Sequence, residues 1–143
     1  MFNWLGQDLT GMRCLDLFAG TGVMGFESLS RGASSVVMVE NQREVVAALR
    51  ENQQALQADK AIIVYSDALQ FLASQNEPFD IIFCDPPYHQ AWLDKCLPLL
   101  VRHLNPDGVV YAEAEIALQD TAQFSVIKHG RAGHVLYHLL KPR

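Results

Sequence analysis

Residues 13–25, which read RCLDLFAGTGVMG, decide the fold class of this chain. The apolar run 13–18 ends in the turn signal Ala-Gly-Thr-Gly, and this pattern predicts a strand that enters a tight loop. A helix over about 23–30 is expected to follow the loop. Gly20 and Gly22 permit backbone angles that a Cβ would forbid, and the start of the helix offers amide donors. The stretch therefore predicts a strand, a glycine loop and a helix.

The rest of the chain alternates between the same two kinds of segment. Apolar and β-branched runs predict strands at 35–40, 61–65, 79–84 and 109–113, and helical spacing predicts helices at 43–57, 68–74 and 91–104. Two further segments, 124–128 and 134–140, flank a Gly-Arg-Ala-Gly turn and predict a hairpin at the sheet edge. Continuous apolar strands are typical of parallel sheets with helices on both faces. We expect one α/β domain over 1–143, with a doubly wound sheet of about seven strands and ligand sites at their carboxyl ends.

The composition is that of an ordinary globular domain, with 143 residues of which 50% are hydrophobic and 19% charged. The three cysteines are odd in number and far apart, so neither a disulfide framework nor a metal site is expected, and a reducing cytoplasm is the natural compartment. No apolar run approaches the roughly 18–20 residues of a membrane span, and the first residues do not resemble a signal peptide. The sequence predicts a cytoplasmic protein with neither membrane nor metal partners.

The net charge of −5 is unevenly distributed along the chain. Residues 1–120 carry 7 basic and 16 acidic side chains, whereas residues 121–143 carry 4 basic side chains and no acidic one. An acidic body argues against general affinity for nucleic acids, because that affinity is largely phosphate neutralisation. The basic C-terminal stretch is either a local contact for a polyanion or a solvated edge.

The glycine loop carries a recognisable spacing. Gly20, Gly22 and Gly25 match G-x-G-x-x-G, a fingerprint of dinucleotide binding. Glu40 ends the second predicted strand, 18 residues after Gly22, where a carboxylate can accept hydrogen bonds from a ribose diol. The pattern predicts a cofactor that contains adenosine, and it does not specify which one.

A second motif, Asp85-Pro86-Pro87-Tyr88, follows the predicted strand 79–84. Two consecutive prolines fix φ and remove two amide donors, so the loop becomes a rigid frame that offers acceptors. An exocyclic NH2 group can donate one hydrogen to Asp85 and the other to the Pro86 carbonyl, while Tyr88 stacks on the ring. Such acceptors orient the nitrogen and enrich its lone pair, which favours attack of an amine on an electrophile.

The order of these motifs resembles that of the S-adenosylmethionine-dependent amino-methyltransferases. It comprises the Asp-x-Phe-x-Gly-x-Gly loop, an acid at Glu40, Asp67-Ala68 after the third predicted strand and Asp-Pro-Pro-Tyr after the fourth. Longer stretches are similar to the bacterial enzymes that methylate the N2 amine of a guanine in small-subunit (16S) ribosomal RNA, namely those at 2–5, 15–22, 27–32 and 133–137. The resemblance covers nearly the whole chain.

The resemblance implies a Rossmann-like class I methyltransferase fold, S-adenosylmethionine as cofactor and a monomeric enzyme. Its partner would be ribosomal RNA, in the small ribosomal subunit or its assembly intermediate. The implied cofactor-binding residues are Asp16, Phe18, Gly20, Gly22, Glu40, Asn41, Asp67 and Ala68. The implied catalytic residues are Asp85, Pro86, Pro87 and Tyr88.

One feature departs from the family pattern. Members usually carry a basic segment before the Phe-Asn-Trp-Leu stretch, whereas this chain starts at Met1-Phe2. We expect such a segment to help hold RNA and to close over the cofactor. We therefore expect the 143-residue chain to bind RNA weakly, with a shallow salt dependence.

Other functions remain open from the residues alone. The Asp-Pro-Pro-Tyr motif suits an NH2 group, so adenine N6 or a protein amide could replace guanine N2. A glycine loop also occurs in NAD-dependent dehydrogenases, although such an enzyme gives no account of residues 85–88. A non-catalytic RNA-binding or assembly module could keep the same fold.

Several other conspicuous residues are interpreted as structural. His89 is expected to be a solvated loop histidine in preference to a proton acceptor. His134 and His138 share strand parity and are expected on an exposed face of the final hairpin. Trp4 and Trp92 are expected to pack in the core or against a helix face.

Overall fold

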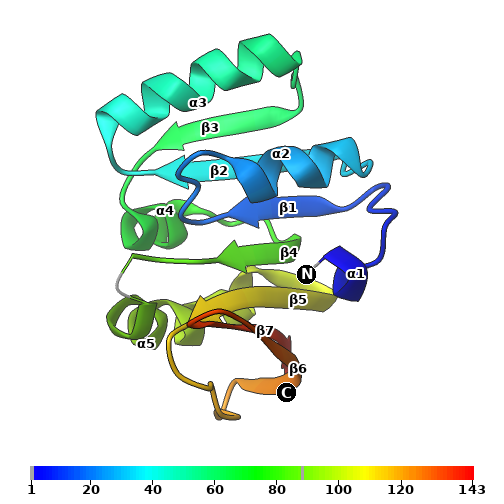
Figure 1. Ribbon diagram of the computed structural model, residues 1–143, viewed down its shortest axis with the longest axis vertical. Helices are drawn as coiled ribbons and strands as arrows, with labels where there is room; N and C mark the ends of the chain where they lie inside the picture. The colour runs from blue at the N-terminus through cyan, green and yellow to red at the C-terminus, as the bar shows by residue number, and fades with distance from the viewer. Residues whose placement is uncertain (1, 88) are drawn as a thin grey trace.

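The structure, a computed structural model, describes residues 2–87 and 89–143 and contains one seven-stranded sheet flanked by helices (Figure 1). Along the chain the elements are α1 (Phe2–Leu5), β1 (Arg13–Asp16), α2 (Val23–Ser30), β2 (Ser35–Glu40), α3 (Arg43–Leu56), β3 (Ala61–Tyr65), α4 (Ala68–Ser74), β4 (Phe79–Cys84), α5 (His89–Leu100), the 3₁₀ helix η1 (Val101–His103), β5 (Leu104–Ala114), β6 (Phe124–Ala132) and β7 (Val135–Pro142). Within the described residues, every helix is too short or too polar to cross a membrane.

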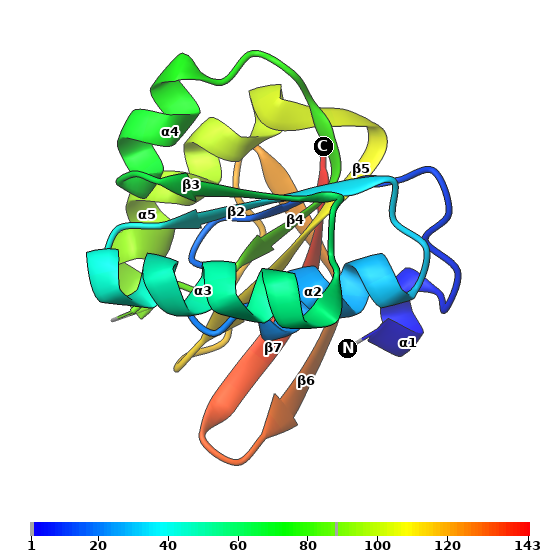
Figure 2. The same cartoon turned by 90° about the horizontal axis from the view of Figure 1, so that it is seen from above.

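The strand order in the sheet is β3-β2-β1-β4-β5-β7-β6. Strands β1 to β5 run parallel, and β7 pairs antiparallel with both β5 and β6. The order reverses between β1 and β4, and ligands of doubly wound sheets bind outside the carboxyl ends of the strands at such a switch point. Helices α1, α2 and α3 cover one face of the sheet, and α4 and α5 cover the other (Figure 2). The predicted doubly wound, mostly parallel sheet with a C-terminal hairpin is confirmed.

Two apolar layers hold the sheet between its helices. One layer packs Leu15 and Ile82 of the central strands against residues of α4 and α5 such as Phe71. The opposite layer packs Met38 of β2 with Leu49 of α3. The strands are apolar on both sides because each face is covered, as the continuous hydrophobic runs predicted. All three cysteines are buried as free thiols.

Strand β5 differs from the expected strand 109–113, because it begins at Leu104 and includes the turn residues 105–108. The register between β4 and β5 shifts across this stretch, which is therefore a bulge. Asn105 Nδ2 donates a hydrogen bond to Asp80 Oδ1 on β4 at 3.0 Å. Residues 105–108, which are of types that usually form turns, thus interrupt the pairing between β4 and β5 without ending β5.

Other boundaries differ by a few residues from those predicted. The glycine loop begins as soon as β1 ends at Asp16. Helix α5 ends at Leu100 and is continued by η1, while β6 and β7 extend to Ala132 and Pro142. The short helix α1 was not predicted.

The prediction of an exposed His138 is wrong. His138 is only 1% exposed, because β7 lies between β5 and β6 and the chain after β5 packs over this histidine. Its Nε2 accepts a hydrogen bond from the Leu118 amide at 3.0 Å, and its Nδ1 lies 3.3 Å from the Ala112 carbonyl oxygen. His134 does not share the strand, since it belongs to the turn before β7 and is exposed.

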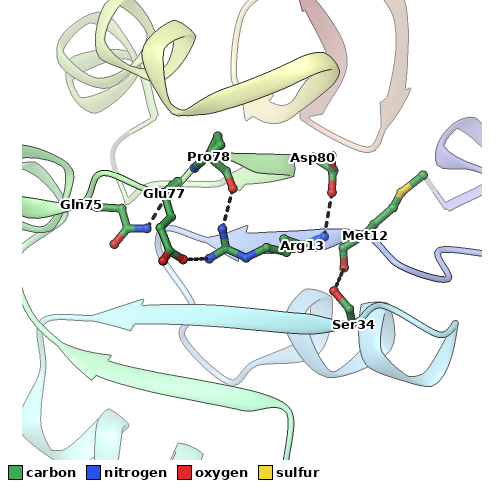
Figure 3. A network of polar contacts seen from close by, with 7 residues as sticks. All are labelled: Met12, Arg13, Ser34, Gln75, Glu77, Pro78 and Asp80. Carbon is green, nitrogen blue, oxygen red and sulfur yellow. Dashed lines mark hydrogen bonds and ion pairs between the residues drawn. The ribbon is translucent and has the colours of Figure 1, made fainter.

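Polar side chains tie β1 and β4 together at their amino ends (Figure 3). The Arg13 guanidinium donates to the Pro78 carbonyl at 2.7 Å and lies 3.2 Å from a Glu77 carboxylate oxygen. The Arg13 amide donates to Asp80 Oδ2 at 2.9 Å, and the guanidinium carbon lies 4.8 Å from the centre of the Phe79 ring. We call these five residues the amino-edge network. Every charge in it has a partner of opposite sign or a hydrogen-bond donor.

Candidate active site

A cleft of about 540 Å³ opens at the carboxyl ends of β1, β2, β3 and β4. These strand ends lie together on one side of the sheet in Figure 1. Nine of the twelve predicted site residues line the cleft, namely Asp16, Phe18, Gly20, Glu40, Asn41, Asp67, Ala68, Asp85 and Pro87. Gly22 and Pro86 do not line it, and Tyr88 lies outside the described residues.

The glycine loop is held in place by backbone hydrogen bonds to the strands on either side of β1. The Leu17 amide donates to the Phe83 carbonyl at 3.1 Å, and the Ala19 amide donates to the Val39 carbonyl at 2.9 Å. Gly20 has a φ of 54°, in the left-handed region, and a Cβ there would meet no other atom within 4 Å. The loop therefore leaves open space beside its backbone at the cleft.

Gly22 serves packing at the start of α2. Its φ is 85°, and a Cβ there would lie 2.5 Å from a Phe26 ring carbon and 2.8 Å from side-chain carbons of Met38 and Leu49. Any larger residue would thus clash with the layer between α2, α3 and the sheet. Packing alone therefore explains why residue 22 is a glycine, without any contact to a ligand.

Glu40 ends β2 and holds the glycine loop against it. One carboxylate oxygen accepts from the Gly20 amide at 3.1 Å, and the other accepts from the Gln42 amide at 2.9 Å. An ionised carboxylate offers about four lone-pair directions, so roughly two remain for a ligand. Asn41, the next residue, is exposed and also lines the cleft.

Asp67 and Ala68 lie where β3 passes into α4. Asp67 is the N-cap of this helix, and its Oδ2 accepts from the Gln70 amide at 3.1 Å. Ala68 is buried, with 4% of its surface exposed, and its small side chain forms part of the cleft wall. The Asp-Ala pair thus caps a helix and shapes the cleft at the same time.

Asp16 is buried beneath the loop, with 3% of its surface exposed. Burial, with smaller contributions from the nearby carboxylates of Asp85 and Glu40, raises its pKa to about 7. Hydrogen bonds from the Gly25 and Phe18 amides act in the opposite direction. An acid in this environment titrates near neutral pH, so its charge responds to any cation that enters the cleft.

The second motif follows β4 directly. Asp85 is half-buried and lines the cleft, Pro86 is buried behind it, and Pro87 is exposed at the cleft. Asp85 and Asp16 therefore lie close together at the switch point, because each follows or ends one of two adjacent parallel strands, β4 and β1. The predicted stacking role of Tyr88 concerns a residue outside the described part of the chain.

Trp92 on α5 lines the cleft, whereas its sequence context predicts only a packing role. Its ring centre lies 5.6 Å from that of Phe18, with the two planes at 66°. The Lys95 ammonium lies 5.2 Å from the centre of the same ring. The sequence could have pointed to this role, because Trp92 lies in the helix that directly follows the Asp-Pro-Pro-Tyr motif.

Other lining residues that were missed are Leu17, Ala19, Thr21, Val23, Met24, Val39, Gln42, Val45 and Ser66.

Glu113, near the end of β5, is a second residue that was missed. It is half-buried, and the side chains of Asp85 and Tyr111 are close enough to act on its pKa. Burial, together with the neighbouring Asp85 carboxyl, raises the pKa of Glu113 to about 8. The sequence feature that could have pointed to Glu113 is that it is the one carboxylate in the otherwise apolar run Val109–Ala114.

The described lining of the cleft contains four carboxyl groups, those of Asp16, Glu40, Asp67 and Asp85, and no Lys or Arg. Such a lining attracts cations and repels anions. The site can therefore hold a cationic ligand and present acceptors to a group rich in N–H donors.

The family described as Conserved hypothetical protein 95 matches residues 1–141 of this chain. The Escherichia coli (strain K12) protein named Ribosomal RNA small subunit methyltransferase D is 36% identical over 144 aligned residues, which cover 97% of this chain and 73% of that protein. The chain belongs to the ribosomal RNA small subunit methyltransferase D family. The Haemophilus influenzae member is 35% identical over 147 aligned residues, covering 97% of this chain and 76% of its own.

A solved structure supports the same family assignment. An Escherichia coli protein described as a candidate methyltransferase superposes with a TM-score of 0.90 at 35% identity, covering 99% of this chain and 81% of that one. The resemblance stated from the motifs is thereby confirmed, and so is the Rossmann-like methyltransferase fold of the family.

Proposed function

We propose that this chain transfers a methyl group from S-adenosylmethionine to the exocyclic N2 amine of a guanine in 16S ribosomal RNA. One observation carries the proposal: a single acidic cleft joins the glycine loop and Glu40 to the Asp85 motif. Family relatives named as methyltransferases of small-subunit ribosomal RNA support the reaction and the substrate class.

The charge of the cleft fits S-adenosylmethionine. When bound, this cofactor supplies an electrophilic methyl group on a positively charged sulfonium, and it also carries an ammonium group. Four carboxyl groups and the absence of Lys and Arg from the described lining suit such a cation. NAD carries an anionic pyrophosphate that the same lining would repel, which disfavours a dehydrogenase.

The residues that would hold the cofactor follow from their places around the cleft. Glu40 has lone pairs left for ribose hydroxyls after it has accepted from the Gly20 and Gln42 amides. The open backbone at Gly20 suits close approach of the methionine part, above the buried Asp16. Asp67 with Ala68 would meet the adenine edge.

Asp85 would orient the reacting amine. Its carboxylate would accept one N–H of the exocyclic NH2 group and so help to direct the nitrogen lone pair along the line of transfer. The Pro86 carbonyl stays the predicted acceptor of the other N–H, although Pro86 does not line the cleft. After transfer the nitrogen is cationic, and its extra proton leaves to the Asp85 carboxylate or to solvent. A guanine must leave its stack to reach this frame, where stacking on Tyr88 stays a prediction.

The proposed partner is ribosomal RNA in the small ribosomal subunit or its assembly intermediate. We propose that this chain binds it as a monomer in the cytoplasm. Hairpin β6–β7 extends beyond the helices (Figure 2). This hairpin and the residue after it carry the four basic side chains of the C-terminal stretch, Lys128, Arg131, Lys141 and Arg143. A small number of phosphate contacts from these side chains would give weak RNA affinity with a shallow salt dependence.

The decisive experiment is incubation of the full chain with methyl-labelled S-adenosylmethionine and undermethylated small ribosomal subunits, followed by nucleoside analysis. Naked 16S ribosomal RNA and a protein fraction serve as parallel substrates. Label in N2-methylguanosine supports the proposal. Label in N6-methyladenosine or in protein would assign the site to another NH2 group, and NAD binding without binding of the methyl donor would overturn the reaction class.

A further inference from the structure

We infer that Glu113 is a positioning residue, which shares one proton with Asp85 and thereby holds the Asp85 carboxylate in the orientation that receives the target amine. The catalytic part of this inference rests on the proposed function. The shared proton itself is a property of the folded chain, and it can be measured without substrate.

The sheet register brings the two carboxyl groups together. Strands β4 and β5 pair in parallel with Cys84 opposite Ala112, so the next residue on each strand is Asp85 or Glu113. Side chains alternate along a strand, and Glu113 therefore shares the face of Tyr111, which packs in the layer beneath α2 and α3. This register places the two carboxyl groups on neighbouring strands, where Asp85 acts on the pKa of Glu113.

The donors and acceptors form a short chain. Two carboxyl groups can hydrogen-bond to each other only if a proton lies between them. Burial and, to a smaller extent, Asp85 raise the pKa of Glu113 to about 8, so Glu113 carries this proton at pH 7 and donates it to Asp85. The Tyr111 side chain, only 3% exposed and on the same face of β5, acts as a donor that lowers the pKa of the Glu113 carboxyl.

The surroundings of Glu113 favour this arrangement. Among the described residues, the charged or titratable groups that act on its carboxyl are Asp85 and Tyr111. Tyr137 on β7 pairs with Glu113 in the antiparallel register, and Asp16 at the end of β1 faces Asp85. Ionisation of Glu113 above pH 8 removes the donor and places two like charges side by side. Asp85 then loses its orientation, so turnover should fall on the alkaline side.

The shared proton is tested by carbon NMR of the full chain with its glutamate carboxyl carbons labelled. Loss of one signal in Glu113→Gln assigns the resonance. In the unmodified chain it should titrate with a pKa of about 8. Asp85→Asn should lower this pKa because it removes the neighbouring charge, and Tyr111→Phe should raise it because it removes a donor to the ionised form. A Glu113 signal with an ordinary glutamate pKa, or one indifferent to Asp85→Asn, overturns the inference.

The positioning role is tested by pH–rate profiles with the substrate of the labelling assay. Glu113→Gln keeps one donor for Asp85 and one acceptor for Tyr111, so it should retain most of the kcat at pH 7 and lose the alkaline fall. Glu113→Ala should lower kcat by about tenfold to a hundredfold with little change in the KM for cofactor. Glu51→Gln, the same substitution on the exposed face of α3, is the control and should keep the original profile.

The two tests separate two kinds of failure. An alkaline fall that persists in Glu113→Gln, or normal kcat in Glu113→Ala, overturns the positioning role. A chain without methyl transfer to any RNA, yet with Glu113 titrating near pH 8, overturns the proposed function and leaves the shared proton standing.

Discussion

Acidic residues lie at both edges of the pair formed by β1 and β4, and their surroundings differ between the two edges. At the amino edge, Asp80 accepts hydrogen bonds from the Arg13 amide and Asn105, while Glu77 pairs with the Arg13 guanidinium. At the carboxyl edge, Asp16 and Asp85 face one another in a cleft whose described lining has no Lys or Arg. The same pair of strands therefore carries acids beside a cation at one edge and acids beside other acids at the other.

The difference between the two edges indicates that the reactive groups of this fold lie at the carboxyl ends of its strands. The pKa values of Asp16 and Glu113 rise to about 7 and about 8 because these acids are buried near other acids. Such an arrangement opposes stability at neutral pH, and clusters of perturbed acids in a cleft are typical of functional sites. A cationic ligand would supply the charge that the carboxyl edge lacks.

Removal of Asp85 should produce the largest effect and would sharpen the comparison most. Asp85→Ala deletes the proposed acceptor of the target amine, so kcat should fall by about 100- to 1,000-fold while cofactor affinity is retained. Turnover is measured by the labelling assay, and cofactor binding by calorimetry. Asp59→Ala, at an exposed position beyond α3, is the control. Equal loss of cofactor binding and turnover would place Asp85 among the cofactor ligands.

The buried acid at the carboxyl edge should make stability depend on pH. The folded-state pKa of Asp16 lies at about 7, above its ordinary value of 3.8, so the folded state holds the extra proton between these values. The contribution of Asp16 to the free energy of unfolding should therefore fall as pH rises from about 4 to 7. Between pH 5 and 8 the unmodified chain should lose about 2–3 kcal/mol relative to Asp16→Asn, as measured by urea unfolding. Parallel pH curves for the two chains would contradict the raised pKa.

Glu40 should affect the cofactor more than the fold. Glu40→Ala removes the acceptor of the Gly20 and Gln42 amides and the proposed acceptor of the ribose hydroxyls. Cofactor binding should weaken by about 1–3 kcal/mol in calorimetry. Glu40→Gln keeps one acceptor and should lose less. If both variants bind the cofactor as tightly as the unmodified chain, the ribose is held elsewhere.

Much of this architecture could be predicted because its causes are local. Apolar runs of strand length and helical spacing predicted the order of elements, and the Gly20 loop, Glu40 and Asp85 lie where the strands end. The stretch 105–108 could not be predicted, because turn-forming residues are the same whether they end a strand or form a bulge in it. His138 was misplaced because its burial depends on β7 lying between two other strands.

The site residues that were missed share a different cause. Trp92 reaches the cleft through contact with Phe18, and Glu113 reaches Asp85 through the β4–β5 register. Both contacts join elements that lie far apart in the sequence, so no local pattern encodes them. Conversely, Gly22 fits a ligand-binding spacing, and the structure uses it to make room for Phe26.

The smallest expected effect tests whether the two edges act independently. Arg13→Ala removes the hydrogen bond to the Pro78 carbonyl and the contact over the Phe79 ring, whereas the Glu77 pair contributes little because the Glu77 side chain is 75% exposed. The free energy of unfolding should fall by about 1 kcal/mol in urea titrations, and calorimetry should show unchanged cofactor affinity. Arg50→Ala, on the exposed face of α3, should change neither quantity. Because β1 carries Arg13 at one end and Asp16 at the other, a loss of cofactor affinity in Arg13→Ala would mean that the strand transmits strain from one edge to the other, and the division between a stabilising edge and a reactive edge would be wrong.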